Sequence, residues 1–189
     1  RLENKLLETK ILEKIIEPTL KGLKDLKTEF IGFLYAGLMI VKGEPFLIEY
    51  NVRMGDPECQ TILPRLKTDF LKVINNCINY NLNSINLEWD EEKSICIVLC
   101  SKGYPDKYNN GIEIKNLKEV KIQKNNYIFH AGTILRDNKI YSNGGRVLNF
   151  VIKSKNLKKS RDDLIKVIEN LNWKNGYFRK DIGFRIIKK

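Results

Sequence analysis

The chain has 189 residues, a hydrophobic fraction of 42% and a formal net charge of +11. This length and hydrophobic content suffice for one globular domain or two small ones with a buried core, which excludes a disordered polypeptide. No apolar run approaches the roughly 18 to 20 residues that a membrane-spanning helix requires, so we expect a cytoplasmic protein that makes no use of a membrane.

The N-terminal half begins with a predicted helix and a predicted hairpin. Apolar residues recur at helical spacing over residues 4–17, and Pro18 is expected to end this helix. Residues 30–41 and 46–52 are apolar, strand-like runs, and the residues between them have the composition of a turn. This pattern predicts an antiparallel hairpin.

A Gly-Asp-Pro-Glu sequence at 55–58 follows the second strand. Asp56 is predicted to cap a helix there, with Pro57 in its first turn, where a missing N–H costs little. Pro64 is expected to break that helix, and helical spacing predicts another helix near 70–78.

The chain becomes polar and acidic over residues 81–92, where we place a boundary between domains 1–88 and 89–189. A helix is predicted over 157–171. Strand-like runs occupy most of the rest, at 94–100, 119–123, 127–130, 133–136, 139–141, 146–152 and 184–187. The predicted fold class is α+β, with antiparallel sheets and a small β-rich C-terminal domain.

Cysteine and histidine are too sparse for a common metal centre. The four cysteines show no CxxC spacing and are interpreted as reduced thiols, and His130 is the only histidine. The positive charge is compatible with nucleic-acid binding, but the basic residues are spread along the chain instead of forming one block. A basic surface that attracts phosphorylated small molecules is the preferred interpretation, with no nucleic acid as partner.

One predicted strand presents a row of polar side chains. Because side chains alternate along a strand, Glu49, Asn51 and Arg53 are expected on one face, with Leu47 beside them. A carboxylate, an amide oxygen and a guanidinium are suited to a magnesium–nucleotide phosphate site. Alternating charges on an exposed sheet face are also common, so the spacing alone leaves both interpretations open.

Motifs along the whole chain carry a resemblance to a known family. They are Gly32-Phe33-Leu34-Tyr35-Ala36-Gly37-Leu38-Met39, Glu49-Tyr50-Asn51-Val52-Arg53, Gly55-Asp56-Pro57-Glu58, Phe129-His130-Ala131-Gly132-Thr133 and Gly144-Gly145-Arg146-Val147-Leu148. Together they resemble the C-terminal portion of the phosphoribosylamine–glycine ligases, which are ATP-grasp enzymes of purine synthesis. The resemblance implies that residues 1–88 are the C-terminal part of an ATP-grasp domain and that residues 89–189 are the ligase's C-terminal domain.

The resemblance also implies a reaction and a set of ligands. Members of that family join glycine to 5-phosphoribosylamine with ATP, through a glycyl phosphate. Glu49 and Asn51 match the family's Mg²⁺ or Mn²⁺ ligands, and Arg53 lies where a cation would stabilise the transferred phosphate. Leu38 and Leu47 are candidates for the adenine pocket.

Four further residues are candidates for contacts with substrate or phosphate. Asp56 and Glu58 either contact substrate or act as a helix cap and a first-turn acid. Arg146 either binds the ribose phosphate, helped by backbone amides, or is a surface charge at a hairpin turn. Arg179 either faces the substrate cleft or forms an ion pair with Asp181.

The chain also departs from the family it resembles. Family members are more than twice as long, and the glycine-rich flap with its ATP-binding lysine is absent from these 189 residues. We therefore expect a missing N-terminal portion of the same enzyme as a partner, and an inactive chain without it. Two alternatives remain open: a different ATP-grasp carboxylate–amine ligase, and a non-enzymatic module derived from such a ligase.

Overall fold

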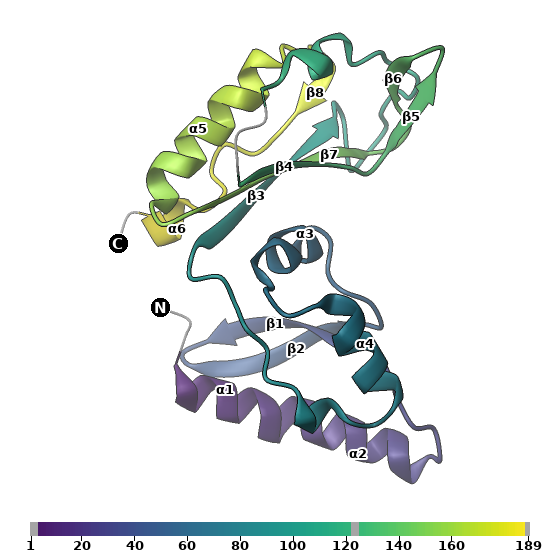
Figure 1. Ribbon diagram of the computed structural model, residues 1–189, viewed down its shortest axis with the longest axis vertical. Coiled ribbons are helices and arrows are strands. Elements are labelled where there is room, and N and C mark those ends of the chain that lie inside the picture. Colours follow the sequence, from purple (N-terminus) through teal and green to yellow (C-terminus); the bar gives the residue numbers. More distant parts are fainter. Residues whose placement is uncertain (1–3, 122–124, 188–189) are drawn as a thin grey trace. The chain divides into compact units, whose positions relative to one another are not determined.

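The computed structural model describes residues 4–121 and 125–187, which form two compact units (Figure 1). The first unit contains the described residues up to Gly55 together with Thr68–Leu87. The second contains Asp56–Lys67 and the described residues from Glu88 onward. The chain therefore enters the second unit for a short segment, returns to the first, and then enters the second again.

A long helical segment opens the first unit. It consists of α1 (Lys5–Ile11), the π-helical turn η1 (Leu12–Ile16) and α2 (Glu17–Asp25), and the Asn4 side chain caps its start. The prediction that Pro18 ends the helix is wrong, because Pro18 lies in the first turn of α2, where a proline is tolerated. The π-helical turn precedes it, with a backbone bond from residue 17 to residue 12.

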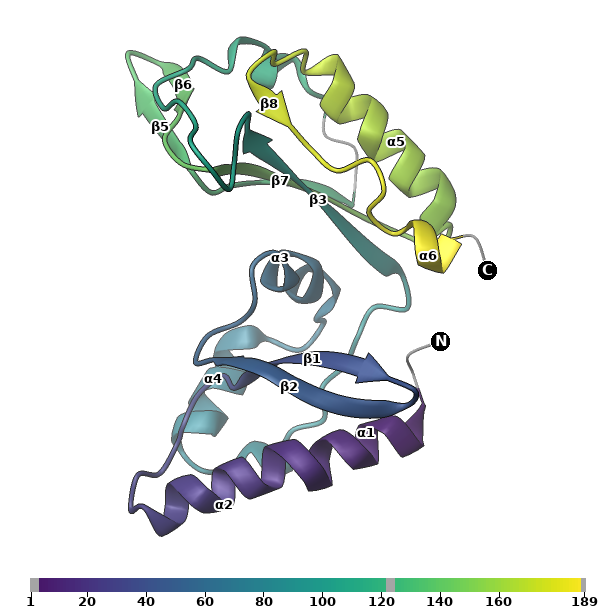
Figure 2. The same ribbon diagram turned by 180° about the vertical axis from the view of Figure 1, so that it is seen from behind.

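The predicted hairpin is confirmed. Strands β1 (Tyr35–Val41) and β2 (Glu44–Asn51) pair antiparallel, and both views show the helical segment running along them (Figures 1 and 2). Lys42 and Gly43 form the connection with φ values of 51° and 81°, as in a two-residue turn with two left-handed positions. The Tyr50 hydroxyl donates to the Ile15 carbonyl at 3.1 Å, which ties β2 to the helix.

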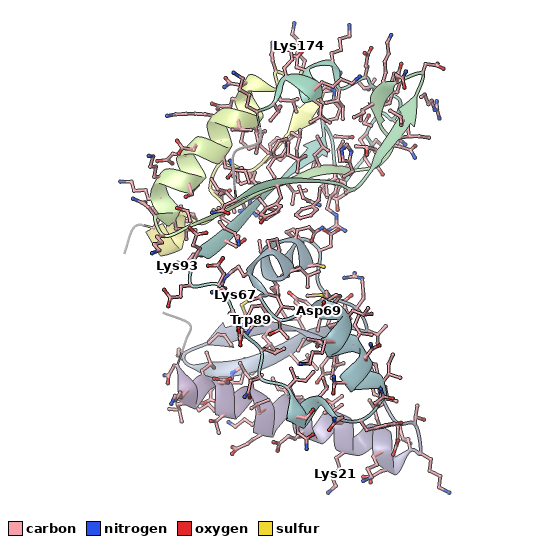
Figure 3. The ribbon with its side chains drawn as sticks, in the orientation of Figure 1. Lys21, Lys67, Asp69, Trp89, Lys93 and Lys174 are labelled. Carbon is pink, nitrogen blue, oxygen red and sulfur yellow. The ribbon has the colours of Figure 1, made fainter. Side chains whose placement is uncertain are left out.

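The other regular elements of the first unit are helical, and the unit carries little buried apolar surface. Asp69, labelled in Figure 3, caps the start of helix α4 (Phe70–Ile78). Its carboxylate accepts from the Lys72 backbone N–H. A short 3₁₀ turn, η3 (Leu82–Ser84), follows. Ile15 is the only buried hydrophobic side chain among the described residues of this unit, so most of its other apolar side chains lie at or near the surface.

The second unit begins with α3 (Glu58–Ile62) and the 3₁₀ turn η2 (Leu63–Arg65). The predicted cap is wrong, because Pro57 occupies the capping position and no side chain bonds the helix start. The backbone pairs next with the segment that re-enters the unit: Lys67 N–H donates to the Glu88 carbonyl at 2.8 Å. Lys67 and Trp89 accordingly lie close together in Figure 3.

The centre of the second unit is an antiparallel sheet in the order β4-β7-β3-β8. Its strands are β3 (Lys93–Ser101), β4 (Asn126–His130), β7 (Arg146–Ser154) and β8 (Gly176–Tyr177), and helix α5 (Leu157–Asn170) covers one face (Figures 1 and 2). Ile97 and Phe150 pair across β3 and β7 and are buried beneath that helix with Leu164. Helix α3 contacts the same two strands from the opposite face.

The remaining elements confirm some predictions and correct others. The strands predicted at 133–136 and 139–141 are confirmed as β5 (Thr133–Arg136) and β6 (Lys139–Ser142), which pair antiparallel around residues 137–138. Of the strand predicted at 119–123, residue 119 ends a 3₁₀ helix, η4 (Lys115–Glu119), and residues 122–123 lie outside the described residues. The predicted final strand is wrong, since Phe184–Ile187 form the short helix α6. None of the described helices is long and apolar enough to cross a membrane.

Candidate functional site

Glu49 and Asn51 lie together on strand β2 of the first unit. The Asn51 Nδ2 donates to Glu49 Oε1 at 3.0 Å, so both side chains occupy the same face, as the alternation predicted. The Asn51 amide nitrogen makes this bond, and the Asn51 amide oxygen takes no part in it. The Glu49 side chain is exposed, as a carboxylate that receives a ligand from solvent needs to be.

A bulge interrupts β2 just before Glu49. Glu49 pairs with Gly37 while Leu47 pairs with Leu38, so Ile48 has no partner in the register. Because Gly37 and Leu38 are successive residues of β1 and point to opposite faces, the bulge breaks the alternation that was expected to place Leu47 beside Glu49. Leu38 and Leu47 are direct cross-strand partners, which is compatible with one apolar pocket.

Arg53 lies beyond the end of the strand. Strand β2 ends at Asn51, and Arg53 occupies a bend, where its Nη1 donates to the Met54 carbonyl at 2.8 Å. The expectation that strand alternation alone aligns Arg53 with Glu49 and Asn51 is therefore wrong. The guanidinium is exposed, and its role toward phosphate remains a prediction.

Asp56 and Arg146 form an ion pair within the second unit. Arg146 Nη2 lies 3.1 Å from Asp56 Oδ2, and Arg146 Nη1 donates to the Asp56 backbone carbonyl at 3.1 Å. The other carboxylate oxygen of Asp56 accepts from Gln60 Nε2 at 2.9 Å. Gln60 was not singled out from the sequence, although its spacing of four residues from Asp56 on a predicted helix was the available signal.

The glycines before Arg146 have a packing explanation. A Cβ at Gly145 would lie 2.1 Å from the Tyr104 ring, and one at Gly144 would lie 3.1 Å from the Gly132 Cα. A Cβ at Gly132 would lie 2.6 Å from the Arg146 carbonyl oxygen. The Gly132 N–H donates to that same oxygen at 2.8 Å. These contacts require glycine for the close approach of backbone to backbone and ring, so the Gly-Gly-Arg sequence is not by itself a sign of phosphate binding.

Glu58 is the first residue of α3, next to a buried thiol. Burial is the main cause that raises the pKa of Cys96 to about 12, and the negative charges of Asp56 and Glu58 add to it. All four cysteines are free, as predicted. At this pKa the Cys96 thiol is protonated at neutral pH, which makes it a packing residue and not a nucleophile.

Arg179 and Asp181 form a bidentate ion pair. Arg179 Nε donates to Oδ1 at 3.0 Å and Nη2 to Oδ2 at 2.6 Å, on the exposed surface of the second unit. This pairing raises the pKa of Arg179 and lowers that of Asp181. Of the two interpretations, the ion pair is the one present in the structure.

Glu49 and Asn51 offer oxygen ligands, which are the type that a hard divalent cation prefers. Mg²⁺ prefers oxygen ligands and completes its shell with water and nucleotide phosphate oxygens, so one carboxylate and one amide oxygen are a sufficient protein contribution. Within residues 4–121 and 125–187 no three His, Cys, Asp or Glu side chains form a group that could hold a metal. A cation here would therefore depend on a bound phosphate.

The net positive charge is concentrated in one part of the sequence. The segments that form the second unit contain 24 lysines and arginines and 14 aspartates and glutamates, whereas those of the first contain 10 and 9. Almost all of the excess of +11 therefore belongs to the second unit. A surface of this sign raises the local concentration of phosphorylated ligands.

Two family models match the chain in succession. The model of the ATP-grasp (A) domain of phosphoribosylglycinamide synthetase matches residues 2–59, and the model of the C domain of the same enzyme matches residues 94–185. The two matches follow the order of those domains and together account for most of the chain.

Individual relatives agree with the family models. The phosphoribosylamine–glycine ligase of Fusobacterium nucleatum is 43% identical over 180 residues, which are 95% of this chain and 42% of the relative. The trifunctional purine biosynthetic protein adenosine-3 of Gallus gallus is 41% identical over 94% of this chain and 18% of its own length. The crystal structure of the phosphoribosylamine–glycine ligase of Thermotoga maritima matches with a TM-score of 0.76 and 28% identity, over 94% of this chain and 43% of that one. The chain thus spans less than half the length of these relatives.

Proposed function

The chain belongs to the phosphoribosylglycinamide synthetase family, and from this premise we propose that it is part of an ATP-dependent ligase that joins glycine to 5-phosphoribosylamine. The product is glycinamide ribonucleotide, formed with ADP and phosphate. The observation that carries the proposal is the Glu49–Asn51 pair, an exposed set of oxygen ligands on a strand within the part matched by the ATP-grasp model.

The proposed reaction has two steps, a phosphoryl transfer and an acyl transfer. The glycine carboxylate attacks the γ-phosphorus of ATP, which forms glycyl phosphate and releases ADP. The amine of phosphoribosylamine then attacks the glycyl carbonyl carbon, an amide bond forms, and phosphate leaves with the electron pair of the C–O bond while the amine loses a proton. Such chemistry depends on positioning and on stabilisation of phosphate charge more than on covalent participation by the protein.

Residues of the first unit would serve the phosphoryl transfer. Glu49 and Asn51 would hold Mg²⁺ or Mn²⁺, which neutralises phosphate charge when bound. Arg53 would stabilise the charge on the transferred phosphate, and its donation to the Met54 carbonyl leaves further guanidinium N–H groups for that purpose. Leu38 and Leu47, as cross-strand partners, would contact the adenine.

Residues of the second unit would bind the phosphorylated substrate. Arg146 has guanidinium donors beyond the two atoms that contact Asp56, and the excess of positive charge in this unit favours an anion. Asp56 and Glu58 would contact the substrate amine. Arg179 is a weaker candidate, because Asp181 already neutralises it through two bonds.

The proposed domain assignment follows that of the family. Residues 1–88 would be the C-terminal part of the ATP-grasp domain and residues 89–189 the C-terminal domain, in a cytoplasmic enzyme. The relatives are more than twice as long as the part that this chain matches. We therefore propose that turnover also requires the N-terminal portion that the relatives possess, including the segment that closes on ATP.

Product identification tests this function. The natural protein that carries these 189 residues is incubated with ATP, Mg²⁺, glycine and freshly prepared phosphoribosylamine, and the products are identified by mass spectrometry. We expect glycinamide ribonucleotide and equimolar ADP, and no product when glycine is omitted. ADP formation with another carboxylate and amine, but not with glycine and phosphoribosylamine, would indicate a different ATP-grasp ligase, and absence of turnover with every pair would indicate a non-enzymatic module.

A further inference from the structure

Gly37 lies directly opposite Glu49 in the β1–β2 hairpin. A Cβ built at Gly37 would lie 3.1 Å from Glu49 Cγ, 3.5 Å from the Glu49 carbonyl oxygen and 3.8 Å from Glu49 Oε1. The first of these contacts is tighter than an ordinary van der Waals contact. The side chain of Glu49 therefore lies over Gly37, and a Cβ at this position would require Glu49 Cγ to shift by a few tenths of an ångström.

The backbone of Gly37 does not require glycine. Its φ is not among the left-handed values found at Gly32, Gly43, Gly103, Gly111 and Gly183. A glycine in the interior of a strand weakens that strand, because it loses more conformational freedom on folding than other residues do. Strand stability thus favours a larger residue at this position, and the explanation for glycine has to come from its contacts.

Two contacts together fix the Glu49 carboxylate. At one end Cγ rests over Gly37, and at the other end Oε1 accepts from Asn51 Nδ2 at 3.0 Å. The bulge at Ile48 immediately precedes Glu49 and sets where its side chain leaves the strand. If residue 37 carried a Cβ, the exposed Glu49 side chain would have to shift by a few tenths of an ångström, which would change the position of its carboxylate relative to Asn51.

We propose that Gly37 is a positioning residue for the metal ligand Glu49. It acts through the space it leaves for the Glu49 side chain and does not itself touch metal or substrate. The inference rests on the proposed function, since it assigns to Glu49 and Asn51 the role of divalent-cation ligands. It adds a third residue to that site, from the opposite strand of the hairpin.

The matched control is Gly22 in α2. It belongs to the same unit, its φ is also outside the left-handed region, and a Cβ there would meet nothing within 4 Å. Gly22→Ala and Gly37→Ala therefore make the same chemical change in the same unit. Only Gly37→Ala disturbs a candidate ligand.

The experiment measures Mn²⁺ binding and stability in the natural protein that carries these 189 residues. The paramagnetic ion broadens NMR signals of nearby nuclei, so an Mn²⁺ titration followed at the Asn51 side-chain amide with ATP present, which supplies the phosphate ligands of the cation, reports weak binding directly. Urea unfolding of the same variants without ligand reports stability. In the unsubstituted chain we expect selective broadening at residues 49–51. Gly37→Ala should weaken the apparent Mn²⁺ affinity at least fivefold with an equal or higher urea midpoint, and Gly22→Ala should leave the affinity unchanged.

The results that would contradict the role of Gly37 differ from the result that would contradict the metal site. Equal Mn²⁺ affinity in the unsubstituted chain and in Gly37→Ala overturns the role of Gly37 while the metal site stands. A lowered urea midpoint in Gly37→Ala also overturns it, because the glycine would then be needed by the fold. Absence of selective broadening in the unsubstituted chain overturns the metal site itself, and with it the inference.

Discussion

Arg146 contacts Asp56 through both of its terminal nitrogens, one at the carboxylate and one at the backbone carbonyl, each at 3.1 Å. The two residues are 90 positions apart in the sequence. The contact attaches the short segment Asp56–Lys67 to strand β7 within the second unit. It therefore provides both a candidate anion site and an anchor for α3.

The anchoring role predicts a loss of stability in Arg146→Ala. Both side chains are partly exposed, so the ion pair itself is worth little, and most of the effect should come from the charge-assisted bond to the carbonyl. We expect the free energy of unfolding in urea to fall by about 1 kcal/mol. Arg136→Ala, at the exposed end of β5, is the control and should change it by less than about 0.5 kcal/mol. Equal losses in the two variants would show that the contact does not stabilise the second unit.

Substitution of Asn149 should have the opposite effect and increase the stability of the protein. It is 1% exposed on the α3 side of the sheet, between Val98 and Phe129 on the neighbouring strands, and neither polar atom of its side chain has a hydrogen-bond partner among the described residues. Replacing an unpaired buried amide by leucine should raise the free energy of unfolding by about 1 to 2 kcal/mol.

Ser142 provides the comparison for Asn149. It is equally buried, but its hydroxyl oxygen accepts from the Ile112 N–H at 3.2 Å. Ser142→Ala should therefore lower the free energy of unfolding by about 1 kcal/mol, because the Ile112 donor loses its partner. A loss of stability in Asn149→Leu as large as that in Ser142→Ala would contradict the assignment of Asn149 as unpaired.

The lowered pKa of Glu44 should make the stability of the protein depend on pH in the acidic range. Hydrogen bonds from Lys10 and then Lys14 lower the pKa of Glu44 from its ordinary value of 4.5 to about 2. Because the folded pKa lies below the unfolded one, the stabilisation is fully present above about pH 4.5 and is lost as the pH falls toward 2. Urea unfolding of the unsubstituted chain and Glu44→Gln should differ at pH 6 and converge near pH 2. A difference that persists unchanged at pH 2 would rule this carboxylate out as the cause.

The elements with strong local signals were predictable. Gly43, Asp137 and Asn138 adopt the left-handed conformations that glycine, aspartate and asparagine tolerate best, and the two hairpins turn at these positions. Pro18 misled the prediction because a π-helical turn precedes it, which residue periodicity does not reveal. The terminal segment Phe184–Ile187 is four residues long, and an apolar run of that length does not distinguish a strand from a helical turn.

The candidate site was predictable only in part. Strand alternation correctly places Glu49 and Asn51 together, because that rule holds for residues two apart in an unbroken strand. The bulge at Ile48 and the end of β2 at Asn51 depend on pairing with β1, so neither the position of Leu47 nor that of Arg53 follows from β2 alone. The contact of Arg146 with Asp56 depends on the tertiary fold.

The central claim is that Glu49 and Asn51 hold the divalent cation of a glycine-dependent ligase. Its most direct test is the rate of glycine-dependent ADP formation by the natural protein as a function of Mg²⁺ concentration, with Glu49→Gln and Asn51→Ala as variants. Glu29→Gln is the control, since it removes an exposed carboxylate of the same unit outside the proposed site. We expect each variant to lose at least about 100-fold in rate at saturating ATP, with unchanged circular dichroism and an unaffected control, because each loses a metal-stabilised phosphate charge. Rates within about threefold of the unsubstituted protein in both variants, with the same Mg²⁺ dependence, would contradict the metal assignment.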